Sequence, residues 1–321
     1  MSADALARVR AGCAEVARRA RCVRIEAGRA AELVREIARG PAPPPGEDPV
    51  HRPPGDEPTA LAFVLTLDAV NFGSGWFPEL RKRPGLSGYF TLATALAEHF
   101  EKEGAFEARE LRELAAADCA RLFGQDLGRP PLAELMELFA RALRELGEFL
   151  LTRHAGDFAG PVREAAGSAA RLVELLAGMP LYRDVSPYQE LEVPFYKRAQ
   201  LTAADLEVAF RGRGPGCFHD LHQLTIFADN LVPHVLRCEG ALVYAPELAR
   251  RIEAGLLLPA GCEEEVEIRA CAVQAVELGL ASLRREGGAA TARALDLALW
   301  QRGQSPRIKA RPRHRTRTTA Y

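Results

Sequence analysis

The chain has 321 residues, 48% of them hydrophobic, so it is long enough to bury one large core or two ordinary ones. Its 43 acidic and 42 basic residues nearly cancel, which excludes a global field that would draw the protein to nucleic acid or to a membrane. Seven cysteines without dense regular spacing favour reduced thiols and a cytoplasmic protein. Arginines interrupt the N-terminal region too often for a signal peptide, and no stretch is apolar enough to span a bilayer.

The first part of the chain predicts two helices and then a loop. Apolar residues recur at three- and four-residue steps over residues 5–20, where Asp4 is placed to cap a helix, and a second helix is expected over 28–39. Residues 40–58 are rich in proline, which lacks a backbone donor and favours extended backbone, so they predict a mobile surface loop. The apolar segment 60–70 is compatible with a buried helix or with a short strand.

Helical periodicity dominates from residue 85 onward, and long alternating strands are absent from the pattern. We expect minor β-structure at most, near residues 23–25 or 61–67. The sequence therefore predicts a mainly α fold, with residues 1–321 forming a single compact domain. The later helices are expected over residues 87–100, 108–123, 132–152, 162–176, 201–210, 229–237, 246–254, 262–285 and 290–300.

One short interval, residues 195–238, combines aromatic, cationic and acidic residues in a way that suits cleavage of an N-glycosidic bond. An aromatic ring can stack on a planar base, a cation can hold an anion, and a carboxylate can stabilise positive charge that develops on a ribose. Within Phe-Tyr-Lys-Arg, Lys197 could neutralise a substrate phosphate, and Arg198 is expected to form an internal salt bridge. Asp229 stands where a helix should begin, so a simple helix cap explains it equally well.

Together with Leu231-Val232-Pro233 and the run Glu-Val-Glu-Ile-Arg-Ala from Glu265, this interval resembles the queuosine salvage family, the queuosine 5'-phosphate N-glycosidases. The resemblance extends from about residue 23 to residue 321. It implies a hydrolase that releases queuine from queuosine 5'-monophosphate for reuse in transfer-RNA modification, with water as second substrate and no cofactor. It also implies a fold similar to that of helix-hairpin-helix DNA glycosylases, a small-molecule nucleotide as the partner, and no stable nucleic acid partner. The oligomeric state stays open.

The resemblance also implies roles for individual residues. Asp229 matches the family's catalytic aspartate, acting either as a covalent nucleophile or by electrostatic stabilisation. Phe227 matches a residue that lines the base pocket, and Asp296 matches an acid that binds the polar edge of the base or its cyclopentenediol arm. Each residue has a simpler interpretation from the sequence alone: Phe227 as a core aromatic, Lys197 as a solvated charge, and Asp296 as an exposed acid on a helix.

The chain departs from the family pattern at three positions that are expected to surround the base. Leu297 stands where a Tyr is expected, Gln301 where a second acid is expected, and Cys22 where a His often precedes the Val-x-Ile segment. These changes put the accepted base in doubt more than the reaction. An N-glycosidase for another purine-like nucleotide therefore remains an alternative.

Metal binding is not predicted. Cys217, His219 and His222 lie close together in the sequence, and the four-residue spacing of His234 and Cys238 is compatible with zinc ligation, but the set matches no established zinc pattern.

The C-terminal segment, residues 302–321, is rich in Arg and free of acidic residues. It could be an arm for RNA, which would make a non-catalytic RNA-binding protein on the same scaffold the rival function. We favour the other interpretation, in which the segment packs across an acidic surface of its own domain.

Overall fold

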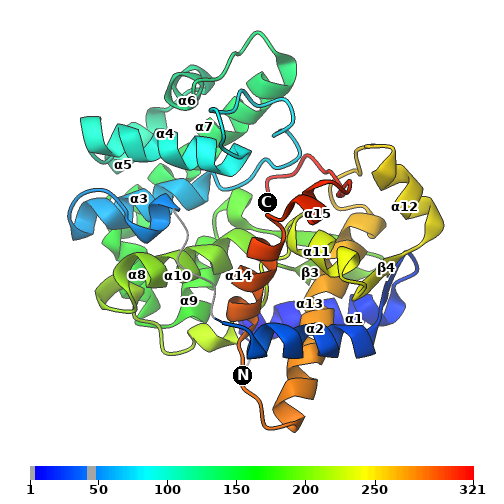
Figure 1. Cartoon of the computed structure of the whole chain (residues 1–321). Coiled ribbons are helices and arrows are strands. Elements are labelled where there is room, and N and C mark those ends of the chain that lie inside the picture. The colour runs from blue at the N-terminus through cyan, green and yellow to red at the C-terminus, as the bar shows by residue number, and fades with distance from the viewer. Residues whose placement is uncertain (1–3, 42–47) are drawn as a thin grey trace. The chain divides into compact units, whose positions relative to one another are not determined.

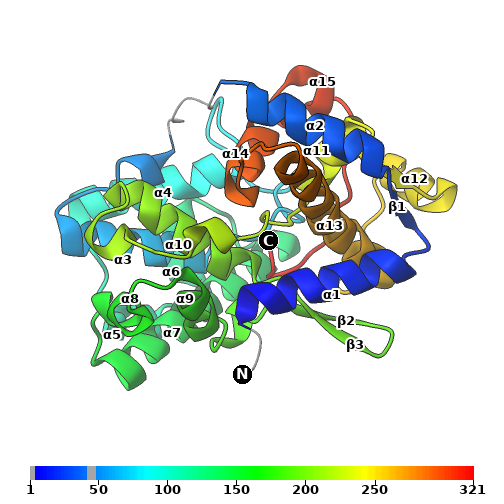
Figure 2. The same cartoon turned by 90° about the horizontal axis from the view of Figure 1, so that it is seen from below.

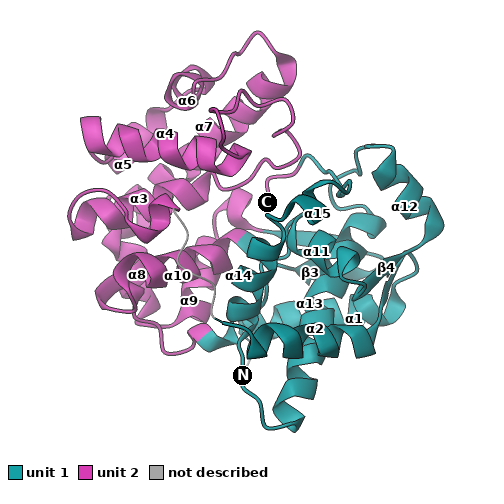
Figure 3. Cartoon of the chain, in the orientation of Figure 1, with its two compact units in different colours: residues 1–44, 184–197, 222–317 teal, residues 45–183, 198–221, 318–321 magenta. Residues whose placement is uncertain are grey.

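The computed structural model describes residues 4–41 and 48–321. It divides into two compact units: unit 1 comprises residues 1–44, 184–197 and 222–317, and unit 2 comprises residues 45–183, 198–221 and 318–321 (Figure 3). Helices predominate in both units (Figure 1), so the prediction of a mainly α fold is confirmed. None of the helices in the described part of the chain is both long and apolar enough to cross a membrane.

Unit 1 is built around the long helix α13 (Glu263–Arg285). This helix packs against α1 (Ala5–Arg19) on one side and α2 (Ala27–Arg39) on the other (Figure 2). Asp4 caps α1 as predicted, because its Oδ1 accepts a hydrogen bond from the amide of Ala7 at 2.7 Å. The remaining helices of unit 1 are α11 (Val232–Cys238), α12 (Pro246–Glu253), α14 (Ala292–Arg302) and α15 (Pro306–Lys309).

The strands that the structure describes form two small antiparallel sheets in unit 1. In one sheet β1 (Val23–Ile25) pairs with β4 (Leu242–Tyr244), and in the other β2 (Val185–Tyr188) pairs with β3 (Leu191–Pro194). The predicted strand at residues 23–25 is therefore confirmed. The other three strands were not predicted, because three or four residues are too few to establish an alternating pattern.

In unit 2 the ambiguous segment 60–70 is helical. It forms α3 (Glu57–Ala69), in which every residue from Ala60 to Ala69 is buried, so the helix has no polar face that could have revealed its period. The other helices of unit 2 are α4 (Gly88–Glu103), α5 (Ala108–Glu113), α6 (Ala116–Phe123), α7 (Pro130–His154), α8 (Ala159–Ala165), α9 (Ala169–Leu176) and α10 (Lys197–Phe210), of which the first residue belongs to unit 1. Short 3-10 turns add η1 (Pro49–His51), η2 (Pro180–Tyr182), η3 (Gly214–Gly216) and η4 (Leu221–Gln223), which ends in unit 1.

Two expected helices are each divided into two, so the predictions for residues 108–123 and 162–176 were wrong in this respect. Between α5 and α6 the backbone of Ala115 is extended, and its amide donates to the Asp118 carboxylate at 2.8 Å. Between α8 and α9, Ser168 caps the second helix by accepting from the amide of Arg171 at 3.1 Å. Internal capping side chains therefore start a new helix where the apolar periodicity suggested continuity.

The proline-rich segment 40–58 contains ordered structure in its second half, whereas residues 42–47 lie outside the described part of the chain. Val50 in η1 is 2% exposed, and Asp48 accepts hydrogen bonds from the Val50 amide and the Tyr89 hydroxyl, both at 3.0 Å. Residues 48–51 thus pack against α4, and deleting them would remove buried contacts.

The basic C-terminal segment packs against the chain itself. Within unit 1, Ile308 is buried, Arg307 forms an ion pair with Glu239, and the carbonyl of Arg315 accepts from the amide of Leu258 at 2.9 Å. Within unit 2, the carbonyl of Tyr321 accepts from the amide of Gly73 at 3.0 Å. These contacts favour the intramolecular interpretation of the segment over that of a free arm.

Candidate active site

Asp229 lies in the irregular segment before α11, and its side chain is half-buried. Its Oδ1 accepts hydrogen bonds from the amides of Leu231 at 2.7 Å and Val232 at 2.9 Å. The helix begins at Val232 and its N-cap residue is Leu231, so Asp229 is not the cap itself but binds the turn that leads into α11. This arrangement is compatible with chemistry, because both hydrogen bonds go to one oxygen and fix the direction of the whole carboxylate.

The carboxyl group of Asp296, in α14, interacts with three other residues that the sequence predicted for the site, Phe227, Asp229 and Lys197. Its Oδ1 accepts from the amide of Phe227 at 2.8 Å, and its carboxyl interacts electrostatically with Asp229 and Lys197. Burial, and secondarily the negative charge of Asp229, raises the pKa of Asp296 to about 8, against the opposing effects of the Phe227 amide and Lys197. The interpretation of Asp296 as an exposed acid is wrong, since the residue is 6% exposed.

Lys197 and Phe227 are both buried in unit 1, each with 7% of its surface exposed. Lys197 is the first residue of α10, and its amide donates to Oδ2 of Asp184 at 3.0 Å. Burial rules out the interpretation of Lys197 as a freely solvated charge. The C-terminal segment contributes a further cation, because the guanidinium of Arg313 is attracted by Asp229.

Arg198 is 1% exposed and lies in unit 2. Within unit 2 its Nη1 donates to the carbonyl of Ala69 at 2.7 Å, and its guanidinium lies 4.4 Å from the ring centroid of Tyr182 and 4.8 Å from that of Phe72. Backbone carbonyls and aromatic rings therefore contact this cation, and the internal salt bridge stays a prediction.

The three residues that depart from the family pattern lie in different surroundings. Leu297 is 41% exposed, and its side chain leaves α14 about 100° around the helix axis from that of its buried neighbour Asp296. Gln301 is half-buried near the end of the same helix. The amide of Cys22 donates to Glu267 at 2.6 Å and its carbonyl accepts from the amide of Ala245 at 2.8 Å, so its backbone contacts lead to α13 and to the residue that follows β4.

Two residues near this cluster received no role from the sequence. Arg269 of α13 is 1% exposed and forms a bidentate ion pair with Asp184, with N–O distances of 2.9 and 2.6 Å. A signal for this pair was present, because an arginine stands in a helix beside the buried apolar residues Val266, Ile268 and Ala270. A buried arginine requires an acidic partner, but the sequence does not identify which acid provides it.

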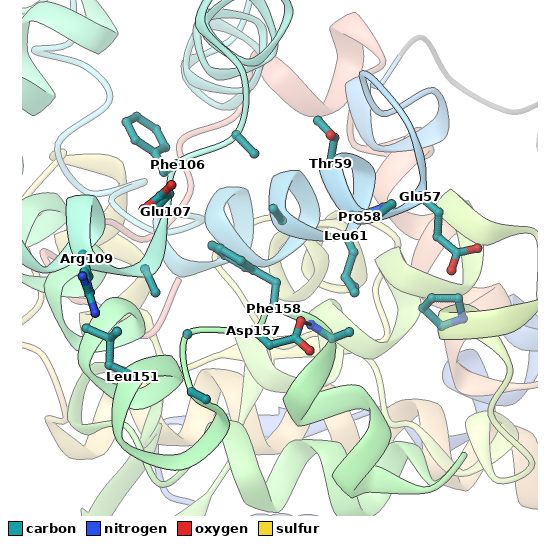
Figure 4. A pocket seen from close by; sticks show the side chains of 17 residues that line it. Glu57, Pro58, Thr59, Leu61, Phe106, Glu107, Arg109, Leu151, Asp157 and Phe158 are labelled. Atoms are coloured by element: carbon teal, nitrogen blue, oxygen red, sulfur yellow. Dashed lines mark hydrogen bonds between the residues drawn. The ribbon is translucent and has the colours of Figure 1, made fainter.

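A separate cavity of about 600 Å³ lies within unit 2 (Figure 4). It opens between the start of α3, the α4–α5 connection and the loop after α7, and Phe106, Arg109, Leu151 and Phe158 are among the residues that line it. Every lining residue belongs to unit 2, whereas Lys197, Phe227, Asp229 and Asp296 belong to unit 1. The cavity is therefore not the site that the sequence predicted.

The possible metal ligands do not converge. Sγ of Cys238 lies 3.5 Å from Nε2 of His234, which is itself 3.2 Å from the carbonyl oxygen of Ile308. Over residues 4–41 and 48–321, no three His, Cys, Asp or Glu side chains are grouped so that they could hold a metal ion.

The cluster can be compared with known proteins. A family model described as queuosine salvage protein matches residues 51–321. A protein of Sphaerobacter thermophilus, named queuosine 5'-phosphate N-glycosylase/hydrolase, is 40% identical over 290 residues, which cover 88% of each chain. A Mus musculus protein with the same name is 32% identical, over 84% of each chain. A Bos taurus protein with that name is also 32% identical, over 99% of this chain and 100% of the relative. The match spans both units and includes every residue of the cluster around Asp296, and the chain belongs to the queuosine salvage protein family.

Proposed function

We propose that this protein hydrolyses the N-glycosidic bond of queuosine 5'-monophosphate and releases queuine for reuse in transfer-RNA modification. The observation that carries the proposal is the convergence of Phe227, Asp229 and Lys197 on the buried carboxyl group of Asp296. The names of the relatives support the same reaction.

Asp229 is the proposed catalytic residue. Cleavage of an N-glycosidic bond develops positive charge on C1' and the ring oxygen of the ribose, and a fixed carboxylate stabilises that charge more than it stabilises the neutral substrate. The two backbone hydrogen bonds to Oδ1 hold Asp229 in place before the substrate arrives, so little reorganisation is needed in the transition state. Water then adds to C1', either directly or after a covalent intermediate on Asp229.

Asp296 supplies a neutral carboxyl group at pH 7, because burial raises its pKa to about 8. A protonated carboxyl donates one hydrogen bond and accepts others, so it can bind an acceptor on the base while its Oδ1 accepts from the Phe227 amide. This arrangement also keeps a second negative charge away from Asp229. We propose that Asp296 binds the polar edge of the base, and that the Phe227 ring stacks on the flat deazaguanine.

The substrate phosphate is assigned to Lys197, whose ammonium group acts in the buried part of the cluster. Arg313 is the second candidate for this contact, because it lies within electrostatic reach of Asp229. Leu297, Gln301 and Cys22 remain proposed neighbours of the base. Among them Leu297 is the weakest candidate, because it is exposed beside a buried acid.

The proposal extends to the fold and the location of the protein. The helical architecture supports a likeness to helix-hairpin-helix DNA glycosylases, with the whole chain acting as one domain and no cofactor taking part. All seven cysteines carry free thiols, which supports a cytoplasmic location. A non-catalytic RNA-binding role is less well supported, because several parts of the basic segment are engaged within the chain.

The test is incubation of purified protein with queuosine 5'-monophosphate and, separately, with common purine nucleotides, with released bases identified by mass spectrometry. Release of queuine from the first substrate alone is expected. Release of a purine base would favour the alternative, an N-glycosidase for another nucleotide. Salt-dependent RNA binding without release of any base would overturn the enzymatic proposal.

A further inference from the structure

The ion pair between Asp184 and Arg269 is among the most buried polar features of unit 1. The two residues are 7% and 1% exposed, and the guanidinium also lies 3.9 Å from the ring centroid of Phe195. A buried ion pair contributes little net stability, because the cost of desolvating both charges offsets their attraction, and well-packed apolar residues often replace such pairs without loss. Its presence here calls for a second explanation.

Asp184 holds the turn that leads into α10. Its carbonyl accepts from the amides of Phe195 at 2.9 Å and Tyr196 at 3.3 Å, and its Oδ2 accepts from the amide of Lys197 at 3.0 Å. Three successive amides therefore converge on one residue. Between them Tyr196 has a φ of 50°, a left-handed conformation that costs a residue with a side chain about 1 kcal/mol or more. Asp184 thus stabilises a strained backbone that ends at Lys197.

Arg269 holds the backbone on the other side of the cluster. Its Nε donates to the carbonyl of Ala228 at 2.8 Å, and Ala228 directly precedes Asp229. The segment around Ala228 has no helical or strand hydrogen-bonding pattern, so this contact helps to fix the backbone directly before Asp229. The same guanidinium therefore connects the residue before Asp229 with the carboxylate that fixes Lys197.

We propose that Asp184 and Arg269 are positioning residues that set the separation between Lys197 and Asp229. The inference rests on the proposed function: Lys197 would bind the 5'-phosphate and Asp229 would act at C1', so the pair would match the protein to the length of a nucleoside monophosphate. Displacing a catalytic group by about 1 Å can lower a rate by about a hundredfold. In this proposal Asp184 and Arg269 contact neither the scissile bond nor the phosphate of the substrate. They act only through the backbone at Lys197 and at Ala228.

The first test is Asp184→Asn, with Asp220→Asn as the matched control. Asp220 of unit 2 is 5% exposed and likewise accepts backbone hydrogen bonds, from Ala169 at 2.5 Å and Ala170 at 3.2 Å. Both variants should lower the melting temperature. We expect only Asp184→Asn to lower kcat on the monophosphate by at least tenfold and to reduce the preference for the monophosphate over the nucleoside. Equal kinetic effects of the two variants would overturn the proposal.

The second test is a double-mutant cycle with Lys197→Ala. If Asp184 acts on the phosphate through Lys197, then Asp184→Asn should reduce the nucleotide-over-nucleoside preference severalfold in the wild-type background and leave it unchanged in the Lys197→Ala background. In both backgrounds kcat on the nucleoside should still fall, because the link through Arg269 to Asp229 is disturbed. Additive losses of preference would show that Asp184 does not act through Lys197.

Arg269→Lys provides the same comparison if Asp184→Asn does not fold. It retains the charge but cannot make a bidentate contact with Asp184 while also donating to Ala228. The expected result is a folded protein with a lowered kcat on both substrates, and an unchanged kcat would contradict the proposal. Failure of this positioning proposal can be distinguished from failure of the proposed function, because in the second case the wild-type protein itself would release no queuine.

Discussion

Two buried carboxyl groups in unit 1 are similar in exposure and opposite in surroundings. Asp184 is 7% exposed and faces a guanidinium that donates two hydrogen bonds to it, whereas Asp296 is 6% exposed and receives one backbone hydrogen bond while a second carboxylate lies nearby. Burial alone therefore does not decide whether an acid is charged. The partner decides as well, and unit 1 contains both a carboxyl group paired with a guanidinium, at Asp184, and one whose pKa is raised to about 8, at Asp296.

The largest expected effect comes from Asp229→Asn, which removes the charge that opposes ionisation of Asp296. Turnover of queuosine 5'-monophosphate should fall by about 10³-fold or more, because the amide cannot stabilise the oxocarbenium ion. Binding of the substrate, measured by calorimetry, should change much less. The matched control is Asp56→Asn, which alters a helix-capping carboxylate of α3 that accepts from Thr59 at 3.1 Å. Near wild-type turnover in Asp229→Asn would leave Asp229 as a cap only.

Lys197→Ala removes the cation that partly counteracts the raised pKa of Asp296. Preference for the monophosphate over the nucleoside should fall roughly ten- to a hundredfold, because a charge-assisted contact of about 1.5–3 kcal/mol stabilises only the substrate that carries the phosphate. Values of kcat/KM for both substrates measure the effect. The exposed Lys309 gives the control, since Lys309→Ala should leave the preference unchanged. Equal losses on both substrates would remove Lys197 from the phosphate site and direct attention to Arg313.

The dependence of kcat/KM on pH above neutrality tests whether Asp296 must be protonated for activity. Since the pKa of Asp296 is raised to about 8, kcat/KM of the wild-type protein should decline above that pH as the carboxyl loses its proton. Asp296→Asn retains a donor and an acceptor but cannot ionise, so it should keep activity within about tenfold at pH 7 and lose the decline near pH 8. A profile that is identical in the two proteins would show that ionisation of Asp296 does not control activity.

The smallest expected effect is on the pH dependence of stability. The carboxyl group of Asp296 has a pKa of about 8 in the folded protein and near 4 in the unfolded chain. Its contribution to the free energy of unfolding is therefore fully present below pH 4 and is lost as the pH rises through about 8. Urea unfolding between pH 6.5 and 8 should therefore show declining stability in the wild-type protein and a flatter profile in Asp296→Asn. The depressed pKa values of His234, to about 4, and His314, to about 3, both from burial, act with the opposite sign and mainly below pH 6.5.

The sequence predicted the parts of this protein that depend on local patterns. Residues 5–20 and 28–39 formed helices close to the expected bounds, since an amphipathic period is a property of neighbouring residues. The division of residues 108–123 and 162–176 was missed because capping side chains compete with that period. Strands β2, β3 and β4 were missed because three or four residues are too few to establish an alternating pattern.

The same distinction applies to the candidate site. Asp229, Phe227 and Lys197 could be selected because they fall in one interval that resembles a known family. Asp184 and Arg269 are separated by 85 residues, and only the folded chain brings them together. The raised pKa of Asp296 also depends on burial and on Asp229, so no local pattern around residue 296 predicts it.

The absence of a polar face on α3 also bears on how the chain reaches its folded state. A helix that is buried on every side, from Ala60 to Ala69, gains its stability only when α4, α7 and α8 pack around it, so it is not expected to persist in isolation. Until then its segment exposes the apolar run of residues 60–65, which could pair as a strand with another copy, and the acidic residues before and after that run, Asp56, Glu57 and Asp68, oppose such pairing. Solubility during expression should therefore depend on those acids more than on any residue of the active site.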